Sequence, residues 1–289
     1  MLYDIVIIGS GVAGLSAGIY AGRANKSVLI IEDNNIGGTT VTLPNINNYP
    51  GFTNISGVEL VSNMYKQCLN FDVKFDFLRI DSIDFNRNII RTDNNIIEYK
   101  TLIIASGSTY KRLNIDTEEK FKLHGLSYCA VCDGNLYKNK KIIVFTKNNS
   151  AINSVKYLKN LTNDIIVMDI SNGFAFDGIE CYHNVLPIEI IGDTNVKGIK
   201  AMIGISEKVL NCDGIFVDLG KVTDIDLYKD NLQNESGFLI TDENLHTNIP
   251  NVFVAGDIRK KSLRQIVTAC SDGAIASTEA IKYLSKNIF

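Results

Sequence analysis

A glycine-rich turn near the start of the chain constrains the fold more than any other feature of the sequence. The apolar run at residues 3–8 is typical of a buried parallel strand, and it leads directly into the G-x-G-x-x-G motif of residues 9–14. Apolar positions with helical spacing follow, and a second apolar run at residues 27–31 ends at Glu32. Together these segments form a βαβ unit of roughly 30 residues, which predicts a parallel, doubly wound sheet.

The glycines of this turn have separate mechanical tasks in binding a dinucleotide. Gly9 permits the tight turn, Gly11 lets the backbone approach a pyrophosphate, and Gly14 allows the helix to pack closely on the strand. The helix N-terminus then faces the phosphates. Glu32, 21 residues after Gly11, falls where an acid accepts hydrogen bonds from the adenosine ribose. The motif predicts dinucleotide binding, and the alternative is a glycine turn that serves packing alone.

A second βαβ-like unit begins near residue 142. Strand-like runs at 142–145 and 164–168 flank a segment with helical spacing at 150–161. The pattern predicts an α/β protein with two Rossmann-like, three-layer nucleotide-fold domains, the second inserted into the first. A length of 289 residues suits two such domains. We expect one domain from residues 1–112 and 238–289, and the inserted domain from residues 113–237.

Composition and charge argue against several classes of function. The net charge is −3 and the sequence has no basic tail, which disfavours nucleic acid as a partner. No apolar stretch approaches the roughly 18 residues of a membrane span, and the first residues lack the basic region of a signal peptide. We therefore expect a cytoplasmic protein with no membrane partner.

Cys129 and Cys132 are the only two of the six cysteines that lie close enough in sequence to act as a unit. Structural disulfides are rare in a reducing cytosol, where a C-x-x-C pair is more often redox-active or metal-binding. If the pair opens a helix, the helix dipole lowers the thiol pKa, and Asp133 is then placed to shuttle a proton. The alternatives are inert packing and half of a zinc site, for which the sequence offers no second ligand pair. We expect no metal.

Several further motifs follow one another along the chain. They are Gly37-Gly38-Thr39-Thr40, Asn48-Tyr49-Pro50-Gly51, Ala105-Ser106-Gly107, the C-A-V-C-D-G box of residues 129–134, Val254-Ala255-Gly256-Asp257 and Arg264-Gln265. With the glycine-rich turn before them, these motifs resemble in their order the low-molecular-weight thioredoxin reductases over essentially the whole chain. The resemblance implies the pyridine nucleotide-disulfide oxidoreductase type of fold, an FAD cofactor, a thioredoxin as partner and a homodimer.

The same resemblance assigns roles to individual residues. It places Asp257 at the ribityl chain of FAD and the helix start near Gln265 at the flavin's pyrimidine edge. It makes Cys132 the flavin-side sulfur and Cys129 the sulfur that attacks the partner, with Asp133 beside them. The cofactor-binding residues that it implies are Gly9, Gly11, Val12, Ala13, Gly14, Glu32, Gly38, Thr39, Asn48, Ala105, Gly107, Gly256, Asp257, Arg264, Gln265 and Ile266.

The inserted domain departs from this family at both places where the family binds NADPH. The family usually carries a G-x-G-x-x-A loop and then a basic cluster that grips the 2′-phosphate. Here residues 146–151 read T-K-N-N-S-A, so that side chains replace glycines. Residues 168–171 read M-D-I-S, so that Asp169 stands where a phosphate needs a cation. We expect this domain to keep the fold without binding NADPH.

This loss resembles the ferredoxin-dependent flavin thioredoxin reductases, which implies ferredoxin as the electron donor. Because ferredoxins are usually acidic, the basic residues at 259, 260, 261 and 264 form the expected docking surface, against the alternative of a solvated loop. Tyr283 and Phe289 are candidates to cover the nicotinamide face of the flavin. Three other functions stay open: an NADPH-dependent thioredoxin reductase with a divergent site, a dithiol oxidase, and a flavin-bound redox sensor without turnover.

Overall fold

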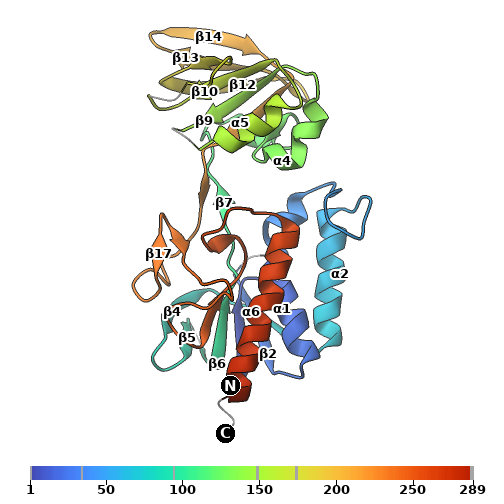
Figure 1. Cartoon of the computed structure of the whole chain (residues 1–289), viewed down its shortest axis with the longest axis vertical. Coiled ribbons are helices and arrows are strands. Elements are labelled where there is room, and N and C mark those ends of the chain that lie inside the picture. The colour runs from blue at the N-terminus through green and yellow to red at the C-terminus, as the bar shows by residue number, and fades with distance from the viewer. Residues whose placement is uncertain (1, 34, 94, 148–149, 173–174, 287–289) are drawn as a thin grey trace. The chain divides into compact units, whose positions relative to one another are not determined.

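Two compact units make up the chain in the computed structural model, which describes residues 2–33, 35–93, 95–147, 150–172 and 175–286. Unit 1 comprises Met1–Thr109 and Thr223–Phe289, and unit 2 comprises Tyr110–Val222. The chain therefore leaves unit 1 once and returns to it once, as an inserted domain requires (Figure 1). Where the chain crosses, β7 (Thr109–Tyr110) pairs with β16 (Lys221–Val222).

Unit 1 is built on a seven-stranded sheet. Its strands are β1 (Leu2–Ile8), β2 (Val28–Glu32), β3 (Lys74–Phe77), β4 (Ile80–Asp84), β5 (Ile89–Thr92), β6 (Ile96–Ile104) and β19 (Val252–Val254). The order is β3-β2-β1-β6-β5-β4, and β19 also pairs with β6. β1, β2, β3, β6 and β19 are parallel, whereas β4 and β5 extend the sheet as an antiparallel hairpin. The parallel part has the order expected for a dinucleotide-binding fold.

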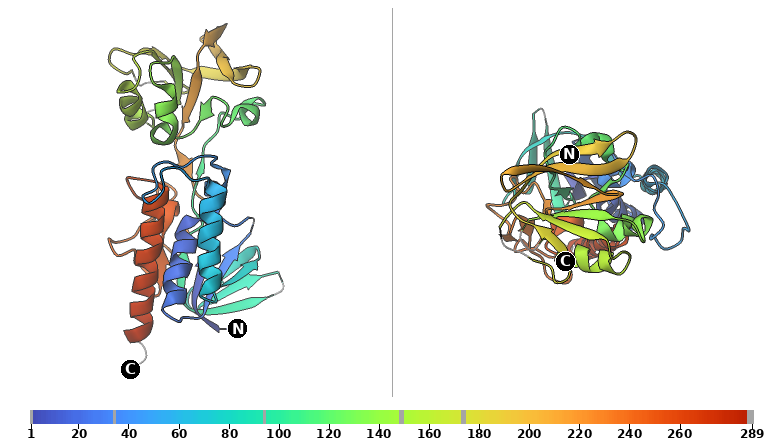
Figure 2. Two further views of the ribbon diagram at one scale, coloured as in Figure 1. Left: turned by 90° about the vertical axis from the view of Figure 1, so that its right-hand side faces the viewer. Right: turned by 90° about the horizontal axis from the view of Figure 1, so that it is seen from above.

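Helices cover one face of this sheet (Figures 1 and 2). They are α1 (Val12–Arg23), α2 (Gly57–Asn70) and α6 (Ile266–Lys286). Successive side chains of a strand point to opposite faces, so Ile5 and Ile7 pack under the helices while Val6 and Ile8 belong to the core on the other face. Burial on both faces explains why β1 and β2 are continuous apolar runs.

The chain that follows the second crossing covers the other face of the unit 1 sheet. Tyr228 and Leu232 are buried there, in the same hydrophobic core as Val6 and Ile8. Residues 223–237 therefore belong to unit 1, and the crossing at 222/223 comes earlier than the expected boundary at 237/238. A short antiparallel hairpin follows in the chain, formed by β17 (Asn234–Glu235) and β18 (Phe238–Leu239).

Unit 2 contains the second nucleotide fold. Its five-stranded parallel sheet has the order β11-β10-β9-β15-β8. These strands are β8 (Leu126–Ser127), β9 (Ile142–Thr146), β10 (Ile165–Asp169), β11 (Glu180–Tyr182) and β15 (Gly214–Asp218). An antiparallel sheet packs on one face, with strands β12 (Val185–Gly192), β13 (Val196–Ile203) and β14 (Ser206–Asn211). Helices pack on the other face: α4 (Ala130–Asp133) and α5 (Ile152–Lys159).

The expected α/β class with two nucleotide folds is confirmed. The short elements that complete the chain are α3 (Glu118–Phe121), η1 (Gly38–Thr42), η2 (Gly134–Tyr137) and η3 (Gly256–Ile258). The final helix begins at Ile266, and ahead of its first turn Thr268 Oγ1 accepts a hydrogen bond from Gln265 N. Among the helices of the described residues, none is both long and apolar enough to cross a membrane.

The packing of residues 223–237 predicts a difference between two leucine substitutions. Leu232→Ala removes a side chain that is 3 % exposed in the unit 1 core, and we expect it to lower the free energy of unfolding by about 2 to 5 kcal/mol. Leu186→Ala, at a unit 2 position that is 64 % exposed, is the matched control and should change it by less than about 0.5 kcal/mol. Urea unfolding with hydrogen exchange measures both. Equal stability of the two variants would place residue 232 outside the core.

Candidate functional site

The glycine-rich turn between β1 and α1 combines two tight contacts with one open position. A Cβ atom added to Gly9 would lie 2.5 Å from the carbonyl oxygen of Ala105, and one added to Gly14 would lie 1.9 Å from that of Gly9. Among the described residues, no atom lies within 4 Å of the corresponding position on Gly11. Gly9 and Gly14 are therefore required by packing, whereas Gly11 leaves room for a ligand to approach the backbone.

The carboxylate of Glu32 is anchored beside this turn. It accepts hydrogen bonds from Ser10 N at 2.9 Å, Ser10 Oγ at 2.7 Å and Asp33 N at 3.1 Å. Gly11 is the N-cap of α1, and no side chain of the described residues caps the first N–H groups of that helix. A helix N-terminus beside an acid at the end of the second strand is the arrangement that holds a pyrophosphate and a ribose. Ser10 is a residue that sequence reasoning missed.

Two other glycine segments lie against the turn. Gly37 forms an isolated parallel bridge with Gly11, and a Cβ atom on Gly38 would lie 3.5 Å from Gly11 Cα. A Cβ atom on Gly256, which has a φ of +79°, would lie 2.8 Å from the Ala13 Cβ. The structure therefore brings together residues that are more than two hundred positions apart in the sequence.

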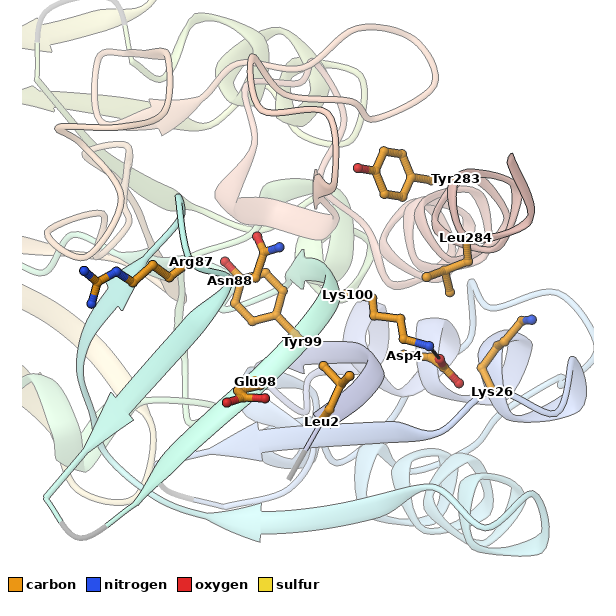
Figure 3. Close-up of a pocket in the computed structure, with 10 residues that line it drawn as sticks. All are labelled: Leu2, Asp4, Lys26, Arg87, Asn88, Glu98, Tyr99, Lys100, Tyr283 and Leu284. Carbon is orange, nitrogen blue, oxygen red and sulfur yellow. Dashed lines mark hydrogen bonds and ion pairs between the residues drawn. The ribbon is translucent and has the colours of Figure 1, made fainter. Parts of the chain in front are cut away.

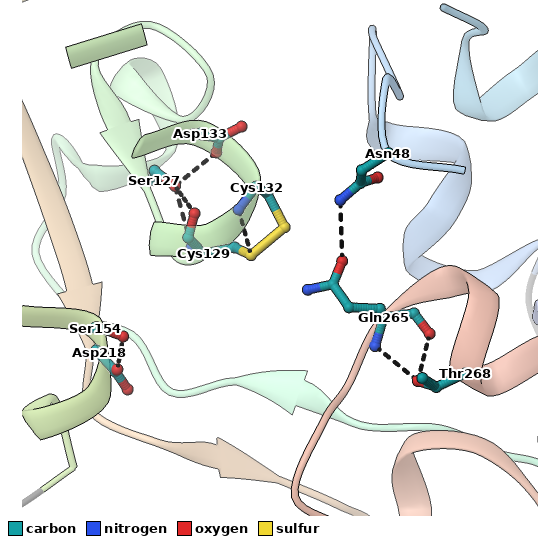
Figure 4. Close-up of a disulfide and its surroundings, with 9 residues drawn as sticks. All are labelled: Asn48, Ser127, Cys129, Cys132, Asp133, Ser154, Asp218, Gln265 and Thr268. Carbon is teal, nitrogen blue, oxygen red and sulfur yellow. Dashed lines mark hydrogen bonds between the residues drawn. A yellow bond between two sulfur atoms is a disulfide. The ribbon is translucent and has the colours of Figure 1, made fainter. Parts of the chain in front are cut away.

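The remaining expected cofactor residues of unit 1 follow the same edge of the sheet or the start of α6. Asn48 Nδ2 donates a hydrogen bond to Gln265 Oε1 at 3.2 Å (Figure 4). Gly107 has a φ of +74° and open space around its missing Cβ, within the described part of the chain. Four further residues occupy these segments: buried Val12, exposed Thr39, half-buried Asp257 and half-buried Ile266. Donors at α1, an acid at Glu32 and open backbone at two glycines fit an FAD-type dinucleotide.

Asp272 on α6 is a buried acid that the sequence analysis overlooked. Its carboxylate accepts hydrogen bonds from Gly256 N at 3.0 Å, Arg259 Nε at 2.8 Å and Lys261 Nζ at 2.7 Å. The Lys261 side chain is only 7 % exposed. A buried carboxylate needs such partners because removing a charge from water costs several kcal/mol. The signal in the sequence is an acid directly before a glycine, among small and apolar residues of the last helix.

The expected basic docking surface at residues 259–264 is therefore wrong. Arg259 and Lys261 are turned inward to Asp272, and Arg264 donates hydrogen bonds to the carbonyl oxygens of both at 3.1 and 3.2 Å. Lys260 is exposed, but its ammonium pairs with Glu235 at 2.6 Å. These cations hold the loop that carries Asp257 and do not present a free positive patch.

Cys129 and Cys132 form a disulfide in unit 2 (Figure 4). Cys129 is the N-cap of α4, and its Sγ accepts a hydrogen bond from Cys132 N at 3.2 Å. The pair therefore opens a helix, but because α4 is a single turn its dipole is weaker than that of a longer helix. Burial raises the pKa of Asp133, and a hydrogen bond from Ser127 opposes that rise. The pair is a disulfide beside a half-buried acid.

The other four cysteines are buried or half-buried thiols. Burial raises the pKa of Cys68 and of Cys212 to about 12, and it also raises the pKa of Cys270. A thiol with a raised pKa is a poor nucleophile at neutral pH. Their burial is typical of cysteines that serve packing.

The turn after β9 in unit 2 is closed by its own hydroxyl groups. Ser150 Oγ accepts a hydrogen bond from Lys147 N at 3.1 Å, and Thr146 Oγ1 accepts one from Ala151 N at 3.2 Å. Ser150 also donates to the carbonyl oxygen of Asp218 on the neighbouring strand β15. Asn148 and Asn149, the middle residues of the expected loop, lie outside the described residues. Within the described part of this turn, the N–H groups of Lys147 and Ala151 are therefore held by side chains.

Asp169 at the end of β10 is fully buried. Its Oδ1 accepts hydrogen bonds from Ser171 N at 2.9 Å and Ser171 Oγ at 2.5 Å, and its Oδ2 lies 3.6 Å from His183 Nδ1. A carboxylate at this place repels a 2′-phosphate. The carboxylate of Asp169 is thus held inside unit 2 by Ser171.

Tyr283 does not lie where a cover for the flavin is needed. It lines a cavity of about 450 Å³ together with Leu284 on α6, and with Leu2, Asp4 and Lys100 (Figure 3). Gln265 immediately precedes α6 and Tyr283 lies near its other end, so the two are separated by most of a helix about 30 Å long. That expectation is wrong for Tyr283, and Phe289 lies outside the described residues.

Known proteins match this chain along almost its entire length. A family described as pyridine nucleotide-disulphide oxidoreductase matches residues 3–273. A thioredoxin reductase of Ureaplasma parvum is 36 % identical, over 99 % of this chain and 98 % of that protein. The crystal structure of a thioredoxin reductase from Streptococcus pyogenes has 33 % identity and a TM-score of 0.91, covering 99 % of both chains. A ferredoxin-flavin thioredoxin reductase from Clostridium acetobutylicum has 29 % identity and a TM-score of 0.56, covering 99 % of both chains.

The contrast between two glycines tests the dinucleotide turn. Gly14→Ala forces a methyl group into the Gly9 carbonyl, so we expect loss of folded unit 1. Gly11→Ala meets no atom of the described chain, so we expect a folded protein whose affinity for FAD falls at least tenfold because the methyl group occupies the ligand's space. Circular dichroism reports folding, and equilibrium dialysis with FAD reports affinity. Unchanged FAD affinity in Gly11→Ala contradicts the assignment.

Charge reversal at two adjacent lysines tests the Asp272 cluster. Lys261→Glu places a second carboxylate against a buried acid, and we expect it to lower the free energy of unfolding by about 3 to 5 kcal/mol. Lys260→Glu is the matched control on the exposed side, where the expected change is about 1 kcal/mol or less. Urea denaturation of both variants measures the difference. If both variants are as stable as the parent chain, the cluster does not hold the loop.

Proposed function

The chain belongs to the pyridine nucleotide-disulphide oxidoreductase family, in its thioredoxin reductase branch, and on this premise we propose that it reduces a thioredoxin with electrons from a ferredoxin. It is a flavin-dependent disulfide reductase with a C-x-x-C pair. The proposal concerns the donor, the partner protein and the role of each site residue. A homodimer, expected from the resemblance, remains part of the proposal.

Unit 1 is the proposed FAD-binding unit. The first N–H groups of α1 would hold the pyrophosphate, Glu32 the adenosine ribose, and Asp257 the ribityl chain, with Gln265 and Ile266 at the flavin edge. FAD supplies the capacity to accept electrons one at a time and to give them in pairs to a disulfide. The chain supplies the pocket, the disulfide and the proton donor.

The closed turn of unit 2 is the observation that carries the choice of donor. Dinucleotide phosphates bind to free backbone N–H groups, and here those of Lys147 and Ala151 are held by Ser150 and Thr146. Asp169 adds negative charge where NADPH carries its 2′-phosphate. An external one-electron donor removes the need for that site. The similarity to a ferredoxin-flavin thioredoxin reductase of Clostridium acetobutylicum supports the same choice.

The energetics permit this electron path. A plant-type ferredoxin near about −400 mV and a thioredoxin near about −270 mV differ by roughly 130 mV. For two electrons that difference corresponds to roughly 6 kcal/mol in the forward direction. Delivery of electrons to thioredoxin is therefore downhill without any nicotinamide cofactor.

The disulfide is proposed to act by thiol–disulfide exchange. Two electrons and two protons convert the Cys129–Cys132 disulfide into two thiols, and Cys129 then attacks one sulfur of the partner's disulfide. Attack by Cys132 on Cys129 restores the disulfide and releases the partner as a dithiol. Cys132 is exposed and Cys129 half-buried, so the assignment of Cys129 to the partner rests on the family resemblance.

Exposed apolar side chains beside the disulfide provide a surface for that partner. Val131, between the two cysteines, is 47 % exposed, and Leu136 in the following turn is 67 % exposed. Apolar groups around a reactive disulfide suit a protein partner, because their burial on docking excludes water from the exchanging sulfurs. Thioredoxin is the partner that the thioredoxin reductase relatives support.

Flavin absorbance tests the donor directly. The FAD-loaded protein is mixed without oxygen, in turn, with reduced ferredoxin, NADPH and NADH. We expect rapid bleaching with ferredoxin and no bleaching above the buffer rate with either nucleotide, because side chains hold the N–H groups of Lys147 and Ala151 in the unit 2 turn and Asp169 adds negative charge. Rapid bleaching by NADPH alone would overturn the donor assignment.

A cysteine variant controls for the destination of the electrons. Cys129→Ser/Cys132→Ser keeps the unit 1 site, so ferredoxin should still bleach its flavin while no new thiols appear. In the parent protein, thiol titration should rise by two per chain, one for each sulfur of the disulfide. Bleaching without new thiols in the parent would favour a redox sensor, and rapid oxygen consumption with a dithiol would favour a dithiol oxidase.

A further inference from the structure

We propose that Ser127 is a positioning residue for the disulfide chemistry, because its hydroxyl connects the Asp133 carboxylate to the backbone of Cys129. Ser127 Oγ donates a hydrogen bond to Asp133 Oδ2 at 2.6 Å and accepts one from Cys129 N at 3.0 Å (Figure 4). This inference rests on the proposed role of Asp133 as the acid of the exchange. It assigns to a serine, two residues before the disulfide, the task of holding that acid.

Ser127 is held in place by the parallel sheet of unit 2. It is the last residue of β8, where its backbone pairs with Phe216 of β15, and its side chain is 5 % exposed. Asp133, by contrast, ends the single turn α4 that follows the disulfide. A buried serine on a strand is a more rigid support than a one-turn helix can supply for itself. The sheet therefore fixes the position of the Asp133 carboxylate through Ser127.

The hydroxyl has a second acceptor within reach. Besides the carboxylate, the carbonyl oxygen of Cys129 lies 3.4 Å from Ser127 Oγ. A hydroxyl carries one donor and two acceptor sites and rotates to suit its partners. When Asp133 is ionised, the hydroxyl donates to the carboxylate. When Asp133 is protonated, its own O–H can donate to Ser127 Oγ, and the hydroxyl turns to the Cys129 carbonyl.

The exchange reaction needs Asp133 in both of these states. The Cys129 thiolate attacks one sulfur of the partner's disulfide and forms a mixed disulfide, and the partner's second sulfur leaves and takes a proton from Asp133. Cys132 then loses its proton to the Asp133 carboxylate and attacks Cys129. The intramolecular disulfide forms again, and the partner's first sulfur leaves as a thiolate that solvent protonates. Two electrons pass to the partner, and Asp133 ends as it began.

Loss of the Ser127 hydroxyl should change the pKa of Asp133 in one direction. Burial raises the pKa of Asp133, and the hydrogen bond from Ser127 favours the ionised form and so lowers that pKa. Ser127→Ala removes the second influence and leaves the first. The pKa of Asp133 should therefore rise further, so that the carboxylate needed by Cys132 forms at higher pH than in the parent protein.

The pH profile of exchange tests this coupling in the full FAD-loaded chain. The protein is reduced with dithiothreitol, freed of reductant and mixed with 2-hydroxyethyl disulfide, a probe with a basic leaving thiol. One limb of the plot of exchange rate against pH should disappear in Asp133→Asn, and that limb reports the titration of Asp133. We expect Ser127→Ala to move that limb upward by about one pH unit, as expected for loss of a hydrogen bond to a charged group. Ser127→Thr keeps the hydroxyl and should restore the parent profile.

Ser277→Ala is the matched control. Ser277 is also fully buried, and its hydroxyl has no hydrogen-bond partner among the described residues. We expect it to leave the limb unmoved. Carbon-13 NMR of labelled aspartate carboxyls gives the same pKa without a substrate, and circular dichroism verifies folding. If Ser127→Ala does not fold, Ser127→Gly removes the same hydroxyl.

Different results would contradict the role of Ser127 and the role of Asp133. A limb that stays in place in Ser127→Ala, while Asp133→Asn abolishes it, overturns the role of Ser127 and leaves the acid assigned. A profile that Asp133→Asn does not alter overturns the role of Asp133 itself. The double variant should match Asp133→Asn, because without the acid the serine has nothing to position.

Discussion

The close contact between Gly14 and Gly9 determines how unit 1 is assembled. Because neither residue has a Cβ atom, α1 leaves β1 at short range and its N-terminus opens toward the ligand side of the turn. Gly273 allows a similar close approach on the other side of α1. A Cβ atom on Gly273 would lie 2.1 Å from the Ala13 carbonyl oxygen, so α6 also approaches α1 backbone to backbone. Helix α1 is thus fixed between the sheet and α6 by positions that tolerate no side chain.

This packing also places the loop before α6. Asp272 is the residue before Gly273, and its buried carboxylate binds Gly256 N, Arg259 and Lys261. The segment that carries Asp257 is therefore tied to α6 by charge, while α6 is tied to α1 by shape. The binding edge of unit 1 is preorganised by contacts that lie behind it, which reduces the entropy that a bound cofactor must overcome. The cations of residues 259–261 belong to this support.

Sequence patterns were sufficient for the regular elements and insufficient for the irregular ones. Strands β1, β2, β9 and β10 were predicted within two residues, because burial on both faces requires continuous apolar runs. Residues 223–237 have neither strand nor helix periodicity, so their packing on unit 1 through Tyr228 and Leu232 could not be read from spacing. The prediction of a docking surface at Lys260 and Lys261 was wrong for a related reason. Charge is visible in a sequence, whereas the buried Asp272 that turns Lys261 inward becomes visible only in three dimensions.

The two nucleotide folds share a topology and differ in the hydrogen bonds within the turn after the first strand. In unit 1 the helix N-terminus has no side-chain cap among the described residues, so its donors remain for a ligand. In unit 2 the hydroxyls of Ser150 and Thr146 accept hydrogen bonds from the N–H groups of Lys147 and Ala151, ahead of α5. The N-terminus of α5 itself has no side-chain cap among the described residues. The parallel sheet of unit 2 nevertheless keeps a task, since β15 fixes β8 and β8 ends at Ser127 beside the disulfide. In the proposed exchange, the sheet of unit 2 holds the Asp133 carboxylate through Ser127, a task that does not depend on a bound nucleotide.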